Sequence, residues 1–236
     1  MGNPVLGIGS SVGMKLETTP GTKIALTTGA AWLDLVSEGL DHIPVLHRIA
    51  PVVGNRQAHG DFEFVSHSDG SGNIVARVRG DYLAALCDFV LGDSAAGVYY
   101  PIVDDSADLP TYTVEGVKGG QNNVRLVGCK CNTATFRSET NSPLQVELNV
   151  VAMSGERDAV DLATPSYTSW LATPPMMHGG MSFDATDEAW LGGASGPECR
   201  MIEWTLNNNL DIEGYTNSTD RKIIPVGLFE VTGSME

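Results

Sequence analysis

The sequence predicts a mainly β protein: an antiparallel β-sandwich or barrel-like fold with one α-helix, an N-terminal arm and long loops. Apolar and polar residues alternate along most of the longer segments, which is the pattern of half-buried strands. Gly, Asn, Asp, Ser and Pro gather at the breaks between these segments, where turns are expected. Helical spacing of apolar residues is convincing in a single segment.

Composition narrows the class of protein. The 236 residues are 42% hydrophobic, enough for a sizeable core, and they contain no run near about 18 apolar residues that would predict a membrane-spanning helix. Acidic residues outnumber Lys plus Arg by 29 to 14, giving a net charge of −15. Because proteins grip nucleic-acid backbones with cations, this balance argues against direct DNA or RNA binding.

The chain divides into an arm and a single domain. Residues 1–30 are rich in Gly, Thr, Ser and Pro, and we expect them to form an N-terminal arm outside the core. Residues 31–236 are expected to form one β-sandwich domain, interrupted by an irregular region over residues 163–197 that contains several Pro and Gly-Gly pairs. Arms and loops of this length favour packing against partner subunits.

The predicted helix covers residues 81–91. Leu83, Leu86, Phe89 and Val90 recur at helical spacings, with Asp81 placed to cap the start and Gly92 to end the last turn.

The predicted strands fill most of the remaining domain. They cover residues 61–65, 73–79, 112–117, 124–137, 144–152, 201–210 and 228–235. Residues 43–59 are expected to be a loop. We also regard the segment around residues 32–41 as a candidate strand.

Residues able to perform chemistry are scattered. The four cysteines form no CxxC pair, so we expect reduced, mostly buried thiols, and the five histidines show no metal-binding spacing. Neither a cofactor nor a metal is predicted. Asp61 and Glu63 share one face of a strand while Phe62 and Phe64 share the other. A hydrolase that uses two strand carboxylates is therefore one alternative, provided that two of them converge in a cleft.

Several short segments, in chain order, resemble the major tail proteins of long-tailed bacteriophages, the subunits of the tail tube. Their order along nearly the whole chain gives the resemblance its weight. The matching segments are residues 14–22 (MKLETTPGT), 109–115 (LPTYTVE), 124–129 (VRLVGC), 131–136 (CNTATF), 205–210 (TLNNNL) and 231–234 (VTGS).

The resemblance implies a non-enzymatic structural protein of the virion tail, assembled in the host cytoplasm. It implies stacked, hexameric rings of this chain, whose acidic lumen conducts double-stranded DNA during ejection without binding it specifically. Other expected partners are tape-measure, terminator and baseplate or tip proteins, and no membrane is involved. A head-decoration or tail-terminator subunit is the alternative within the virion, because such proteins share acidity and arms.

The resemblance also implies two sets of assembly residues. Tail-tube proteins present side chains to DNA from curved inner hairpins, which suggests as lumen-lining carboxylates Asp34, Glu38, Asp41, Asp61 and Glu63. Apolar residues in the arm and the 43–59 loop lack an evident core, which suggests as inter-subunit contacts Met14, Leu16, Pro20, Ile43, Val45 and Ile49.

Overall fold

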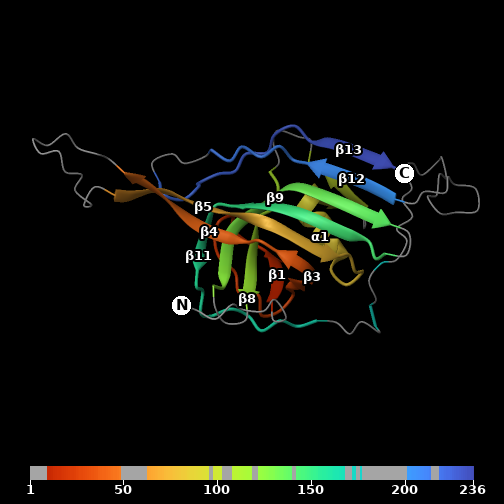
Figure 1. The fold of residues 1–236 in the computed structure, drawn as a ribbon, viewed down its shortest axis with the longest axis horizontal. Coiled ribbons are helices and arrows are strands. Elements are labelled where there is room, and N and C mark those ends of the chain that lie inside the picture. Colours follow the sequence, from red (N-terminus) through yellow and green to blue (C-terminus); the bar gives the residue numbers. More distant parts are fainter. Residues whose placement is uncertain are drawn as a thin grey trace, which may run out of the picture.

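The structure, a computed structural model, describes residues 10–48, 63–95, 98–102, 108–118, 122–139, 142–167, 172–173, 176, 201–213 and 218–236, without the side chains of residues 47, 48, 63, 64 and 95. In this part of the chain the fold is mainly β with one short helix, as predicted (Figure 1). The elements are β1 (Ser10–Leu16), β2 (Ala31–Trp32), β3 (Asp34–Glu38), β4 (Asp41–Arg48), β5 (Glu63–Arg77), α1 (Leu83–Leu91), β6 (Gly92–Ala95), β7 (Val98–Pro101), β8 (Tyr112–Lys118), β9 (Val124–Glu139), β10 (Gln145–Ala152), β11 (Ser154–Arg157), β12 (Met201–Asn207) and β13 (Glu230–Met235).

Two antiparallel sheets share the long strand β9. Its first half pairs with β8 and β11, and these strands with β1 and β2 form sheet A. Its second half pairs with β10 and β12, and these strands with β3, β4, β5 and β13 form sheet B. The change of sheet comes after Cys129, which still pairs with β8, and it follows directly on an irregularity of the β8–β9 pair at Gly128. Gly128 has a φ of +67°, a left-handed conformation that favours glycine.

The segment that contains β2 and β3 closes the ring of strands. β2 pairs with β1 in sheet A, and β3 pairs with β5 in sheet B. Between them, the Leu33 amide donates a hydrogen bond to the Val12 carbonyl at 2.9 Å. Because the strand order returns to its starting segment, the sandwich is barrel-like.

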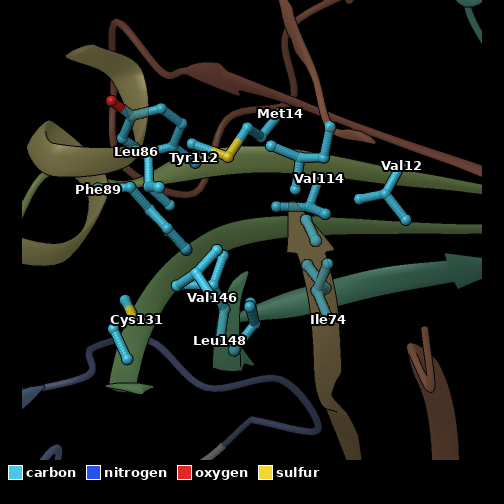
Figure 2. Close-up of a cluster of buried hydrophobic side chains, with 14 of the residues drawn as sticks. Val12, Met14, Ile74, Leu86, Phe89, Tyr112, Val114, Cys131, Val146 and Leu148 are labelled. Carbon is cyan, nitrogen blue, oxygen red and sulfur yellow. The ribbon is translucent and has the colours of Figure 1, made fainter. Parts of the chain in front are cut away.

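The main core lies inside this barrel, and α1 covers one end of it (Figure 2). Leu86 and Phe89 of the helix are fully buried, and the Phe89 ring meets the Tyr112 ring edge to face with 4.9 Å between centroids. Gly92 ends the helix at φ +88°, as predicted. The predicted cap was wrong: the N-cap is Tyr82 and makes no side-chain cap hydrogen bond, while the Asp81 carboxylate accepts from Arg79 at 3.1 Å.

The structure differs from the sequence predictions in the first half of the chain. Residues 10–16, expected in an arm, form β1, which pairs with β8 along its whole length. Residues 43–48, expected in a loop, belong to β4. The two short strands predicted within residues 61–79 are one strand, β5, because Gly72 allows the backbone of Gly39 to approach where a Cβ atom would lie 2.4 Å from the Gly39 carbonyl oxygen.

Candidate assembly surfaces

The outer face of sheet A is covered by loops of the same chain. Glu17, at the start of the loop after β1, turns its carboxylate inward, where it accepts hydrogen bonds from the Thr113 hydroxyl at 2.9 Å and from the Gly128 amide at 2.8 Å. Its other oxygen accepts from the Gly21 amide at 2.8 Å. These bonds tie the loop to the sheet and leave Glu17 buried.

A buried ion cluster fastens a second loop to sheet A. The side chains of Arg125 and Glu115 are 4% and 1% exposed, and the Arg125 Nε lies 2.8 Å from Glu115 Oε1. Arg125 also donates to Glu156 Oε2 at 2.9 Å and to the Asp161 carbonyl at 2.8 Å. Burial alone lowers the pKa of Arg125, but its hydrogen bonds and charge interactions with Glu115 and Glu156 raise that pKa above its ordinary value. Because the cluster is satisfied, it is structural and is not available to an external ligand.

The outer face of sheet B is polar, and within the described ranges no loop covers most of its area. Successive positions on this side carry hydroxyl, amide and charged side chains in rows that follow the strand register. We call this surface the polar face, and its members are Asn73, Val75, Arg77, Thr133, Thr135, Arg137, Gln145, Glu147, Asn149, Glu203, Thr205, Asn207, Glu230, Thr232 and Ser234.

Hydrogen bonds link neighbouring strands across the polar face. Asn149 donates to the Asn73 side-chain oxygen at 2.8 Å, and Asn73 donates to Glu147 Oε1 at 3.2 Å. The hydroxyl groups of Thr135 and Thr205 lie 2.8 Å apart. These links hold the side chains close to the sheet and make the surface even.

The charges on the polar face leave it acidic. Its two arginines are already paired within the chain, Arg77 with Asp34 at 3.3 Å and Arg137 with Glu139 at 2.6 Å. In the described part of the chain, no ion pair involves the face's carboxylates Glu147, Glu203 and Glu230. The surface therefore offers negative charge and neutral polar groups to whatever lies opposite.

A strap, defined as the described residues 208–213 and 218–227, covers one end of sheet B. Two buried cations lie at this end of the sheet: Lys130 of β9, beneath the strap, and Arg221, which belongs to the strap. Lys130 donates to the Ile224 carbonyl at 2.7 Å and lies 2.5 Å from Asp108 Oδ1, while Arg221 donates to the Ala152 carbonyl at 3.0 Å and to Asp69 Oδ1 at 2.5 Å. The strap thus hides the positive charges at this end of sheet B.

The five predicted lumen carboxylates do not form one group. Asp34 lies beside the polar face, paired with Arg77, and its side chain is mostly buried. Glu38 is also mostly buried; it lies 3.3 Å from Lys118 Nζ and accepts from the Leu40 amide. Asp41 lies at the start of β4, 3.7 Å from Arg157 Nε. Asp61 and the Glu63 side chain lie outside the part that the structure describes.

The predicted inter-subunit residues divide into buried and exposed positions. Met14 is buried in the core, so its assignment to an interface was wrong: alternate β1 residues face the barrel interior. Leu16 and Pro20 are exposed, Ile43 is half exposed, and Val45 is partly buried. Ile49 lies outside the described residues.

Sequence reasoning missed two overhangs, where sheet B extends past the barrel at opposite ends of the molecule (Figure 1). The hairpin overhang is formed by residues 41–48 and 63–71 of β4 and β5, and it exposes Ile43, Leu46 and Val65. The β13 overhang is formed by residues 228–236, which pair only with β12 in the described part and expose Leu228, Val231 and Met235. Alternation predicted strands with one buried side in residues 61–65 and 228–235, whereas residues 43–48 were expected in a loop. Only the tertiary structure shows that the barrel leaves the apolar side chains of these segments exposed.

The described residues were also compared with the requirements of a metal site and of a membrane-spanning helix. Among them, no group of three or more His, Cys, Asp or Glu side chains is placed to hold a metal ion. Within the same ranges, no helix has the length and apolar character needed to cross a membrane. Cys87, Cys129 and Cys131 are free thiols, and burial raises the pKa of each.

A closed barrel with one bare polar face and two apolar overhangs defines a structural β-protein whose surfaces are suited to assembly. Residues 7–236 match the family model of phage tail tube proteins, and the chain belongs to this family. It is therefore a structural, non-enzymatic protein of the virion tail that assembles with tail proteins, and the hydrolase alternative is rejected. The match also favours the tail tube over a head-decoration or terminator role. No curated protein matches the sequence significantly.

Proposed function

We propose that six copies of the chain form a ring, that rings stack into the tail tube, and that the polar face of sheet B lines the channel. The observation that carries this proposal is the charge pattern of that face. Both of its arginines are paired with carboxylates of the same chain, whereas Glu147, Glu203 and Glu230 make no ion pair within the described part of the chain.

A channel for DNA needs such a wall. Lysines or arginines facing the duplex would displace its counterions and hold it, whereas carboxylates repel its phosphates over a Debye length of about 8 Å at physiological salt. Six copies of a chain with net charge −15 carry −90 in total, so the ring as a whole also opposes DNA adhesion. The polar side chains of this surface also hydrogen-bond to one another across the strands.

The earlier carboxylate candidates fit this wall unequally. Asp34 borders the polar face and neutralises one of its arginines. Asp41, at the base of the hairpin, is proposed to extend the acidic wall along the tube axis. The same role is proposed for Asp61 and Glu63, whose side chains lie outside the described part. Glu38 is left out, because its buried carboxylate is occupied by Lys118 and the Leu40 amide. Tape-measure, terminator and baseplate or tip proteins are the proposed further partners, with assembly in the host cytoplasm.

The test compares two charge reversals in virions. Glu147→Lys adds a cation to the polar face, and Asp161→Lys makes the same change of charge on the loop that covers sheet A, where the Asp161 side chain is 74% exposed. Both variants should form normal tubes in electron micrographs. We expect Glu147→Lys to slow DNA ejection most strongly at low salt, and Asp161→Lys to eject normally. Equal ejection by the two variants would reject the polar face as the channel wall.

A further inference from the structure

Sheet B is wider than the barrel that it covers, and both overhangs carry apolar side chains that no other described residue of the chain covers. On the hairpin overhang, Leu46 and Val65 stand directly opposite each other in the strand register and are 59% and 39% exposed. On the β13 overhang, Val231 and Met235 are 58% and 62% exposed. Contiguous exposed apolar groups of this kind mark interaction surfaces.

A glycine lies between the two apolar side chains of the β13 overhang. Val231, Gly233 and Met235 alternate along one side of β13, so no side chain stands between the two apolar ones. Gly233 lies opposite Trp204 of β12, and the Trp204 ring stacks on Phe136 with 5.3 Å between centroids. A rigid aromatic pair thus supports the place where an apolar side chain from outside would fit.

The positions of the overhangs fix the type of contact that they can make. They lie at opposite ends of the molecule, one at the hairpin and one at β13 (Figure 1). A contact between unlike patches at opposite ends is heterologous, and it joins copies head to tail, as a ring requires. Contacts between like patches would produce two-fold dimers, which do not close into a six-membered ring.

Charge does not oppose this contact, although whole chains repel each other at −15. Among the described side chains of the hairpin overhang, Asp69 is held by Arg221 and Asp41 lies near Arg157. On β13, Glu230 pairs with Asn207 in register and so falls on the polar face, on the other side of the strand from Val231. Among the described side chains, the carboxylates next to the two apolar surfaces are therefore either paired or on the other side of their strand.

We propose that the hairpin overhang of one copy packs against the β13 overhang of the next copy in the ring, with Leu46 and Val65 seated beside Val231 and Met235. This inference rests on the proposed ring. It commits to a second copy of this chain as the occupant of both surfaces, because the family self-assembles and the two surfaces are matched in polarity.

Cross-linking of assembled tubes tests the contact. The full-length double variant Leu46→Cys/Val231→Cys, oxidised as tubes and run on a denaturing gel without reductant, should give a ladder of covalent oligomers. Each single variant and the unaltered chain, which already contains four cysteines, should stay monomeric. Tubes of the double variant without a ladder would overturn the proposed contact while leaving the tube itself intact. Symmetric dimers from either single variant would overturn it as well.

A second pair of variants keeps the test sharp if the cysteines disturb assembly. Leu46→Asp places a charge on the hairpin overhang, and Val98→Asp places one at a residue of β7 that is 51% exposed and outside both overhangs. Both should show the circular dichroism of the unaltered chain. We expect Leu46→Asp to raise the protein concentration needed for tube formation at least tenfold, and Val98→Asp to leave it unchanged. Equal assembly by both variants would reject the contact. Failure of the unaltered chain to form rings would reject the proposed function instead.

Discussion

Sheets A and B enclose the same core, yet their outer faces are built in opposite ways. Sheet A is covered by loops of its own chain and fastened by Glu17 and by the buried cluster around Arg125. On sheet B, most of the outer face is not covered by described residues. Its polar side chains are linked across strands, and its arginines are paired with neighbouring carboxylates. The outer face of sheet A is occupied by contacts within the chain, whereas the outer face of sheet B is available for contact with other molecules. This contrast is the basis for placing the polar face at the channel.

The core that both sheets share sets the largest expected effect. Phe89→Ala removes a fully buried ring that contacts Tyr112, and we expect it to lower the free energy of unfolding by about 3 to 5 kcal/mol. Chemical denaturation of the unassembled protein measures this. A change below about 1 kcal/mol would mean that the helix contributes little to the barrel.

The ion cluster over sheet A should come next. Glu115→Gln removes the buried partner of Arg125 and leaves that guanidinium with two more exposed charged partners, Glu156 and Asp161. We expect a loss of about 3 kcal/mol, because a buried charge loses its compensation. The same denaturation experiment checks this, and a loss no larger than that of a surface substitution would show that the cover of sheet A is dispensable.

The junction between the sheets should be sensitive to the smallest added side chain. Gly128→Ala forces a left-handed conformation on a residue with a Cβ atom, which would lie 2.6 Å from the Met153 sulfur. We expect a loss of about 1 to 2 kcal/mol from backbone strain and crowding. Met153→Ala in the same chain should relieve the crowding and leave the strain, so the double variant separates the two causes. Full stability of Gly128→Ala would show that β9 changes sheets without needing glycine.

The polar face should be the most tolerant region. Glu147→Gln keeps the shape of an exposed side chain and its oxygen acceptor for Asn73, so we expect the free energy of unfolding to change by less than about 0.5 kcal/mol. Glu147→Gln and Glu115→Gln make the same chemical change on sheet B and on sheet A, so their losses of unfolding free energy can be compared directly. Similar losses for the two variants would remove the contrast between a completed face and an open one.

Local pattern predicted the strands that make up the middle of the barrel. Residues 112–117, 124–137 and 144–152 alternate clearly, and β8, β9 and β10 cover them within a few residues. β1 escaped prediction because its segment is rich in small and polar residues and takes its partner β8 from a part of the chain about 100 residues away. Gly13 allows Trp32 and Leu26 to pack where a Cβ atom would lie within 3 Å of both, and no local pattern reports such an approach.

The candidate surfaces were less predictable than the fold. Asp34 was found from its charge beside a candidate strand, but its pairing with Arg77 depends on the register of β3 on β5. Met14 was misplaced because an apolar residue in a polar segment has the same pattern whether it packs inside its own barrel or against another subunit. The polar face combines five strands from distant parts of the chain, so its rows could be read only after the register was known.

The most direct test of the account is a reconstruction of the assembled tube by electron microscopy at a resolution that separates strands. If the polar face lines the channel, the map will show six copies in each ring with the strands of sheet B next to the channel. Glu147 and Thr135 will lie on the channel wall, and the loops that cover sheet A will face outward. A map in which residues 158–167 border the channel, or in which the polar face is buried between stacked rings, would contradict it.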